Sequence, residues 1–219
     1  MPRLRVVLLA LTALIASVAV AVGLRCHAAD QALAAGTARE PGVVDIRFAQ
    51  FMSQHHDQAI RMAQALLDAP AGDAVQLARG ISTQQLLELG EMRGWLKLWG
   101  QSSVPESRSM DWMLLSDTAP DAILRQYLLE CSRSAAGMPG MATRAELLQL
   151  GQAQGRDREH LFLTLMQRHH EGGLPMARFA ARNARLPVVR ELASRMVGEQ
   201  VQELAAIQVM QARLAAAGP

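Results

Sequence analysis

Two stretches of this chain repeat each other, and this repeat limits the fold more than any other feature of the sequence. The stretch FAQFMSQHHDQAIRMA at residues 48–63 aligns with FLTLMQRHHEGGLPMA at residues 162–177 at a constant offset of 114. The segment that follows each stretch matches as well, at an offset of 115, in the pairs Gln85/Gln200, Glu88/Glu203 and Leu89/Leu204. The simplest interpretation is an internal duplication of a unit of two helices.

The spacing of apolar residues predicts helices throughout. From Val43 onward these residues recur at intervals of three and four, and no alternating strand pattern interrupts them. Long helices are predicted over residues 43–68, 73–99, 155–185 and 187–216. Two helical hairpins that face each other make a four-helix bundle. We therefore expect an all-α fold, a four-helix bundle from two duplicated helical hairpins, preceded by an N-terminal apolar segment.

The expected bundle covers residues 43–217, and it divides into a first repeat at 43–100, a connector with a short helix at 101–142, and a second repeat at 143–217. A further short helix is predicted after Thr143 and Glu146, which form a capping box. The short helix of the connector is expected to open at Pro120. Its apolar side is expected to comprise Ile123, Leu124, Tyr127, Leu128 and Cys131.

The N-terminal segment has the pattern of a targeting sequence. Residues 6–24 carry no charge and follow Arg3 and Arg5. As a helix, this segment spans roughly 28 Å, which is just enough for the core of a bilayer. Residues 1–25 are therefore either a signal peptide or a membrane anchor, and residues 26–42 are a linker. The lack of a clear small-x-small cleavage site favours the anchor. In both cases we expect the protein to be exported, either periplasmic or anchored on the outer face of the cytoplasmic membrane.

Both histidine pairs are predicted to lie on the inward face of their helices. At about 100° per residue, the apolar residues and both histidines of the first stretch fall within about 120° of arc, the width of a core-facing stripe. These residues are Phe48, Met52, His55, His56, Ala59, Met62, Ala63 and Leu66. Asp57, Gln58 and Arg61 fall well outside the stripe. The second stretch repeats the pattern with Phe162, Met166, His169, His170, Gly173, Met176 and Ala177.

The partner helices add polar groups to the same interior. On a helical projection, Gln85 and Glu88 share a stripe with apolar residues, and so do Gln200 and Glu203. A buried carboxylate is costly unless it is paired or hydrogen-bonded. One interpretation is a metal-free polar layer, in which the two carboxylates accept hydrogen bonds from imidazole N–H groups and fix the register of the helices.

The charge balance argues against one class of function. The formal net charge is +2, and without Arg3, Arg5 and Arg25 the chain carries 19 basic and 20 acidic residues. A nucleic-acid-binding protein usually has a basic face or stripe, and we find none in this sequence, so no nucleic-acid partner is expected. The two cysteines, Cys26 and Cys131, fit neither a CxxC pattern nor zinc spacing.

The other interpretation of the polar interior is a metal site. The chain has 12 methionines, and methionine flanks both histidine pairs. Neutral imidazole and thioether together suit Cu(I), while imidazole also suits Cu(II) or Zn(II). The predicted ligands are Met52, His55, His56 and Met62 in the first repeat, and Met166, His169, His170 and Met176 in the second. Around these ligands we expect Gln85, Glu88, Gln200 and Glu203. Glu88 and Glu203 would either orient the imidazole rings or, with a harder ion, bind it directly.

Both units resemble the bacterial domain-of-unknown-function family 305. The resemblance covers about residues 43–217 and rests on Asp45-x2-Phe48-x3-Met52-x2-His55-His56-x5-Met62-Ala63, on Gln85-x2-Glu88-x3-Met92-x2-Trp95-Leu96, and on Phe162-x3-Met166-x2-His169-His170-Glu171 followed by Gln200-x2-Glu203. It implies an exported, ferritin-like four-helix bundle, and a copper-binding role is attributed to some members. The paired histidines and their flanking methionines then become the expected ligands.

The second unit departs from this pattern, which leaves open whether both repeats bind. The departures are Glu159, Gly173, Ile207 and Met210, where the first unit has Asp45, Ala59, Met92 and Trp95.

Three functions compete at this point. The first is an extracytoplasmic protein that binds or buffers copper, with Cu(I) favoured over Cu(II) and Zn(II). The second is a membrane-anchored structural or partner-binding bundle with a metal-free polar core. The third, a di-iron enzyme, needs Glu-x-x-His motifs on inward helix faces, and the sequence contains none, so we do not expect an enzyme. The oligomeric state is left open.

Overall fold

The computed structural model describes residues 40–67, 73–116, 119–134 and 138–216, together with Val20, Gly23 and Arg25. The chain divides into two units, Met1–Glu40 and Pro41–Pro219. The predicted signal peptide or anchor at residues 1–25, apart from those three residues, and most of the linker at 26–42 lie outside the described residues. Among the helices that are described, none is both long enough and apolar enough to cross a membrane.

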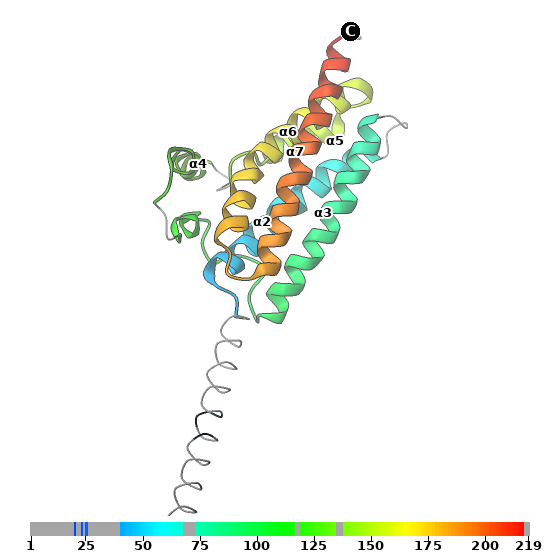
Figure 1. Cartoon of the computed structure of the whole chain (residues 1–219). Coiled ribbons are helices and arrows are strands. Elements are labelled where there is room, and N and C mark those ends of the chain that lie inside the picture. Colours follow the sequence, from blue (N-terminus) through cyan, green and yellow to red (C-terminus); the bar gives the residue numbers. More distant parts are fainter. Residues whose placement is uncertain are drawn as a thin grey trace, which may run out of the picture. The chain divides into compact units, whose positions relative to one another are not determined.

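The described part of the chain is helical and contains no strand, so the all-α expectation is confirmed (Figure 1). The elements are α2 (Val43–Leu67), α3 (Asp73–Leu98), the short 3-10 helix η1 (Asp111–Leu114), α4 (Ala122–Arg133), α5 (Arg144–Gln152), α6 (Gly155–Asn183) and α7 (Pro187–Ala216). The four long helices begin and end within two residues of their predicted bounds.

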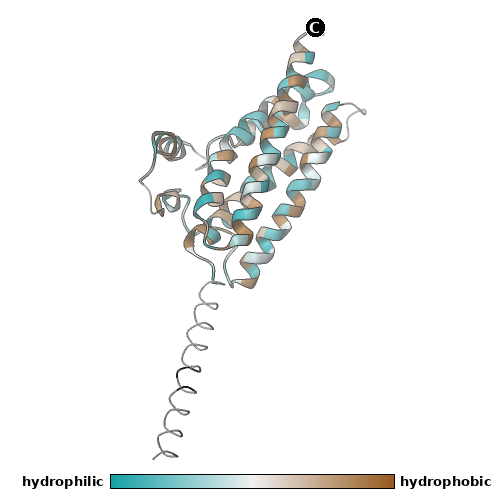
Figure 2. Cartoon of the chain, viewed as in Figure 1, coloured by the Kyte–Doolittle hydropathy of each residue, from teal (hydrophilic) through white to brown (hydrophobic). Residues whose placement is uncertain are grey.

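The four long helices pack in a ring. α2 packs along α3, and α6 packs along α7; the ring closes because α2 also contacts α6 and α3 contacts α7. In Figure 2 each long helix carries both hydrophilic and hydrophobic residues, as expected for a helix that buries one face and exposes the other. The hairpins therefore enclose an interior between them.

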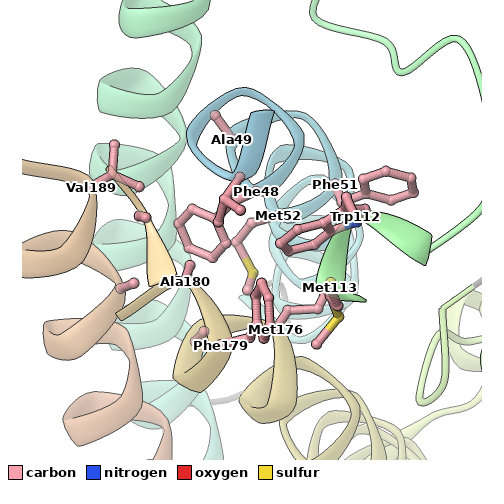
Figure 3. Close-up of a cluster of buried hydrophobic side chains, with 14 of the residues drawn as sticks. Phe48, Ala49, Phe51, Met52, Trp112, Met113, Met176, Phe179, Ala180 and Val189 are labelled. Atoms are coloured by element: carbon pink, nitrogen blue, oxygen red, sulfur yellow. The ribbon is translucent and has the colours of Figure 1, made fainter. Parts of the chain in front are cut away.

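Buried apolar side chains form two clusters. The first, here called the Phe48 cluster, includes Phe48, Met52, Met176 and Phe179, and Figure 3 shows these four side chains close together. The second, here called the Phe162 cluster, includes Met62, Leu66, Phe162 and Met166. Each cluster takes residues from both α2 and α6, so both hairpins contribute to each part of the core.

The connector helix α4 differs from its prediction in two ways. It begins at Ala122, not Pro120, because the Asp121 side chain accepts a hydrogen bond from the Leu124 backbone N–H at 2.7 Å and acts as the N-cap. Ile123, expected on the apolar side, is 75% exposed, while Tyr127 and Cys131 are buried. α4 therefore buries only a narrow face. The predicted Thr143/Glu146 capping box at the start of α5 is confirmed.

The turn before α5 lies against α6 and covers a polar residue of α2. Gly140 has a φ of +82°, and a Cβ on Gly172 would lie 2.1 Å from the Pro139 carbonyl oxygen, so backbone meets backbone here. Gln58, which the helical projection places outside the core-facing stripe, is covered by this turn. Its side chain is buried and exchanges two hydrogen bonds with the backbone of Ala142, at 3.0 and 2.6 Å. A helical projection cannot show that a distant segment covers this position.

Asp45 fastens the start of α2 to the loop between α6 and α7. Its side chain is fully buried and accepts hydrogen bonds from the backbone N–H groups of Gly42 at 2.7 Å, Arg185 at 3.2 Å and Leu186 at 2.9 Å. These bonds join the two hairpins at one end of the bundle. The matching residue in the second hairpin is Glu159, which is only partly buried.

We predict that Asp45→Ala lowers the free energy of unfolding by about 3 kcal/mol, because it leaves three backbone donors without a charged acceptor. The matched control is Glu159→Ala, for which we expect a change within about 0.5 kcal/mol. Urea denaturation followed by circular dichroism measures both. Equal losses in the two variants would contradict the role assigned to Asp45.

Candidate metal centre

Four imidazole rings meet between α2 and α6. His55, His56, His169 and His170 are all fully buried. The ring centroids of His55 and His169 are 3.6 Å apart, with an angle of 35° between the ring planes. The Nε2 atom of His169 lies 3.0 Å from the His55 carbonyl oxygen and donates to it. The two histidines that match at the offset of 114 are therefore the two whose rings lie against each other.

The second histidine of each pair bonds to a carboxylate from the partner helix. His56 Nε2 lies 2.7 Å from Glu88 Oε2, and His170 Nε2 lies 2.6 Å from Glu203 Oε2. The Glu88 side chain is 3% exposed and that of Glu203 is 18% exposed. When Nε2 donates its proton to a carboxylate, Nδ1 keeps a lone pair, and this is how proteins orient an imidazole for a metal ion.

Burial keeps three of these rings neutral. Removal from water lowers the pKa of His55 and of His169 well below the usual value, and the neighbouring imidazoles add to the effect. Burial also lowers the pKa of His56 to about 3. Neutral imidazole is the form that binds metal ions.

Several buried nitrogens of this layer have no hydrogen-bond partner among the described residues. They are both ring nitrogens of His55 and the Nδ1 atoms of His56, His169 and His170. A buried polar atom left without a partner costs about 1–3 kcal/mol. A neutral imidazole has a basic lone pair on only one of its two nitrogens, so the histidine layer, which we define as these four residues, carries one lone pair on each ring that an ion can satisfy.

The two predicted glutamines border the same layer. Gln85 and Gln200 are each 3% exposed, and within the described part of the chain the Oε1 atom of each has no hydrogen-bond partner. A Cβ on Gly173 would lie 3.3 Å from Gln200 Oε1 and 2.8 Å from His55 Cε1. Gln200 and His55 therefore converge on Gly173, and the absence of a side chain there gives the His55 ring its space.

The four predicted methionine ligands divide between the two apolar clusters. Met52 and Met176 lie in the Phe48 cluster, whereas Met62 and Met166 lie in the Phe162 cluster, and all four are fully buried. Each cluster thus receives one of these four methionines from each hairpin, because α2 and α6 run in opposite directions. Predicted methionine ligands of different repeats therefore share a cluster.

The donor set of the layer fits a soft ion. Among the described residues, no three side chains of the His, Cys, Asp and Glu types are placed as a preformed metal site. What the interior offers is neutral imidazole nitrogen with thioether sulfur in the flanking clusters. This is the donor chemistry that Cu(I) prefers.

The sequence prediction missed a polar contact next to the layer. The Gln84 side chain donates a hydrogen bond to Glu199 Oε1 at 3.1 Å, which joins α3 to α7. These residues stand beside Gln85 and Gln200 and match each other at the same offset of 115. The offset was therefore the signal that could have revealed them.

Comparison with known proteins places these residues in a family. The model of the DUF305 family, described as a domain of unknown function, matches residues 45–211. That range contains every predicted ligand and both carboxylates. In a comparison with curated proteins, no relative of this chain was found.

Solved structures of similar proteins share the fold. A DUF305 protein from Streptomyces coelicolor, inferred to be secreted, is 32% identical with a TM-score of 0.67, over 78% of this chain and 94% of that one. A DUF305 fragment from Deinococcus radiodurans is 26% identical with a TM-score of 0.61, over 80% and 99%. CopM in its Cu(I)-bound form is 24% identical with a TM-score of 0.55, over 77% and 96%. CopM has also been solved in Cu(II)-bound and silver-bound forms.

We predict that Gly173→Ala disturbs the histidine layer. The added methyl group meets His55, whose ring cannot retreat because it lies against His169, so the free energy of unfolding falls by about 1–3 kcal/mol. The matched control is Gly198→Ala on α7, where a Cβ meets nothing within 4 Å and the substitution stabilises the helix by up to about 1 kcal/mol. Urea denaturation compares the two. A Gly173→Ala variant as stable as the control would contradict this placement of His55.

Proposed function

This chain belongs to the DUF305 family, and from that premise and the histidine layer we propose that it binds copper, with Cu(I) favoured, and buffers it outside the cytoplasm. The proposal concerns binding and not catalysis. Its ligands are side chains of α2 and α6, and the carboxylates of α3 and α7 support them.

One observation carries the proposal: the lone pairs at the centre of the layer. In the described part of the chain, both nitrogens of His55 and the Nδ1 atom of His169 are buried without a partner, although the two rings are in contact. A polar layer that served only to fix helix register would be expected to satisfy its own nitrogens. A bound cation satisfies lone pairs that no donor in the core reaches.

The choice of copper rests on the sulfur atoms and on one neighbour. Met52 and Met176 on one side of the chain's core, and Met62 and Met166 on the other, supply thioethers from both hairpins. Thioethers bind Cu(I) and contribute little to Zn(II). CopM, which has the same fold at 24% identity, is known in Cu(I)-bound and Cu(II)-bound forms, and this makes copper the first metal to test here.

The proposed location follows from the N-terminus and from a relative. Residues 6–24 are uncharged and stand behind Arg3 and Arg5, as in a signal peptide or an anchor. The Streptomyces coelicolor protein, inferred to be secreted, is 32% identical over most of both chains. We place the protein outside the cytoplasm on these grounds, in the periplasm or on the outer face of the membrane.

A metal-free polar core is the second candidate, and one observation favours it. Three of the four histidines already use one ring nitrogen: His56 with Glu88, His170 with Glu203, and His169 with a backbone carbonyl. These bonds also fix the positions of the helices, with or without an ion. The two candidates differ in what the remaining nitrogens do.

We predict that the double variant His55→Leu/His169→Leu lowers the affinity for Cu(I) by more than about 100-fold. It removes the unpartnered nitrogens of the central rings and leaves both His–Glu pairs in place. Without metal, the variant should be as stable as the parent or more so, since apolar groups replace unsatisfied polar ones. Anaerobic titration against a chromophoric Cu(I) chelator measures affinity. If the parent binds no more tightly than the variant, the metal-free core is correct.

A second prediction separates copper from zinc. Leucine at Met52, Met62, Met166 and Met176 should weaken Cu(I) binding by at least about tenfold and leave Zn(II) binding within about twofold, because only Cu(I) draws on thioethers. Methionine-to-leucine changes conserve volume and cost less than about 1.5 kcal/mol each. The matched control is Met113→Leu, a fully buried methionine of the Phe48 cluster. Equal losses for both metals would exclude thioether ligation.

A further inference from the structure

We infer that the seam between α3 and α7, where Gln84 meets Glu199 between Glu88 and Glu203, is the entrance through which a metal cation reaches the histidine layer. This inference rests on the proposed function, since it needs a cation that binds inside. It assigns a task to Glu199 and Gln84, which the layer itself does not require.

The entrance begins at the hydrogen bond between Gln84 on α3 and Glu199 on α7. The side chain of Glu199 is partly exposed and accepts this bond at 3.1 Å. Glu88, four residues after Gln84 on α3, has an almost completely buried side chain. Carboxylates on both helices of the seam attract a cation.

From these carboxyls a chain of polar atoms leads inward. Glu88 uses Oε2 for the His56 ring, while its buried Oε1 atom accepts from no N–H or O–H donor of the described residues. Glu203 holds the His170 ring from the other hairpin and is itself 18% exposed. Beyond both carboxylates stands the pair of His55 and His169, whose rings lie against each other. Oxygen ligands at the surface thus give way to nitrogen ligands inside.

A second observation points to a ligand on this route. Gln200, next to Glu199 in the chain, is 3% exposed and directs Oε1 toward His55, as its distance from the Gly173 position shows. Within the described residues this oxygen has no hydrogen-bond partner, and the same holds for Gln85 Oε1. Amide oxygens are suitable transient ligands for a cation that has lost water, because they carry no charge to trap it.

The other sides of the layer are closed. α2 and α6 pack against each other far more extensively than α3 and α7 do. The Phe48 and Phe162 clusters contain fully buried aromatic and methionine side chains. A hydrated cation that crossed this apolar packing would lose its water without gaining a ligand in exchange, which is prohibitively costly. Figure 1 shows α3 and α7 side by side along the seam that remains.

The test measures rates as well as affinity, using the purified full chain and Cu(I) supplied anaerobically in acetonitrile-containing buffer. Stopped-flow tryptophan fluorescence follows association, and capture by an excess of chromophoric chelator follows dissociation. The variant is Glu199→Gln, which removes the charge and retains the shape. The matched control is Glu91→Gln, an exposed α3 carboxylate paired with Arg195, which loses the same charge. A second variant, Glu199→Arg, places a cation across the seam.

We expect Glu199→Gln to slow association and dissociation alike by about tenfold, with the equilibrium constant within about twofold of the parent, because an entrance changes the path and not the end state. Glu199→Arg should slow both further, and Glu91→Gln should change neither. Rates in Glu199→Gln and Glu199→Arg equal to those in Glu91→Gln would overturn the inference while leaving copper binding intact. A loss of affinity through faster dissociation would make Glu199 a ligand and also overturn it. A parent chain that binds no Cu(I) would refute the proposed function itself.

Discussion

The burial of four imidazoles between two helical hairpins is the constraint on which this structure depends. Taking imidazole nitrogens out of water is costly unless they find hydrogen-bond partners. The surrounding helices must therefore supply acceptors at fixed positions along the bundle axis. Glu88 and Glu203 do so for one ring on each side, and the His55 carbonyl does so for His169. These bonds set how far each helix slides along its neighbour. The Phe48 and Phe162 clusters then fill the space on the two sides of the histidine layer.

The two hairpins make matching contacts, but three differences separate them. Asp45 joins its hairpin to the α6–α7 loop, whereas Glu159 is partly exposed. Ala59 in one hairpin corresponds to Gly173 in the other, and the missing methyl group makes room for His55. Gln84 corresponds to Glu199, so at this matched position only α7 carries a carboxyl group. The interior is therefore nearly symmetric at the histidine layer and asymmetric at the seam between α3 and α7, through which an ion would enter.

Local periodicity was sufficient to predict the helices and the inward faces, because both depend on residues three or four positions apart. Phe48, His55, Met62 and their counterparts are buried as the 100° rotation predicts. What failed depended on segments distant in the sequence. Ile123 stays exposed on α4, although its spacing placed it on the apolar side. Gln58 lies outside the core-facing stripe and is covered by the turn before α5, which no local pattern could indicate. Spacing along one helix contains no information about which neighbour lies opposite. The family resemblance is confirmed over residues 45–211, whereas the ligand assignment remains a proposal.

The imidazoles and the carboxylates come from different helices, and this affects how the metal affinity of the proposed centre could be changed by substitution. All four imidazoles come from α2 and α6, while the carboxylates that hold two of them come from α3 and α7. A substitution on the first pair of helices deletes a donor atom and changes the chemistry in one step. In the proposed copper centre, a substitution on the second pair would alter only the basicity and tilt of a ring that stays in place, typically worth 10- to 100-fold in affinity, about 1–3 kcal/mol. Substitutions on α3 and α7 would thus adjust the metal affinity in steps, whereas substitutions on α2 and α6 would remove a ligand from the bundle.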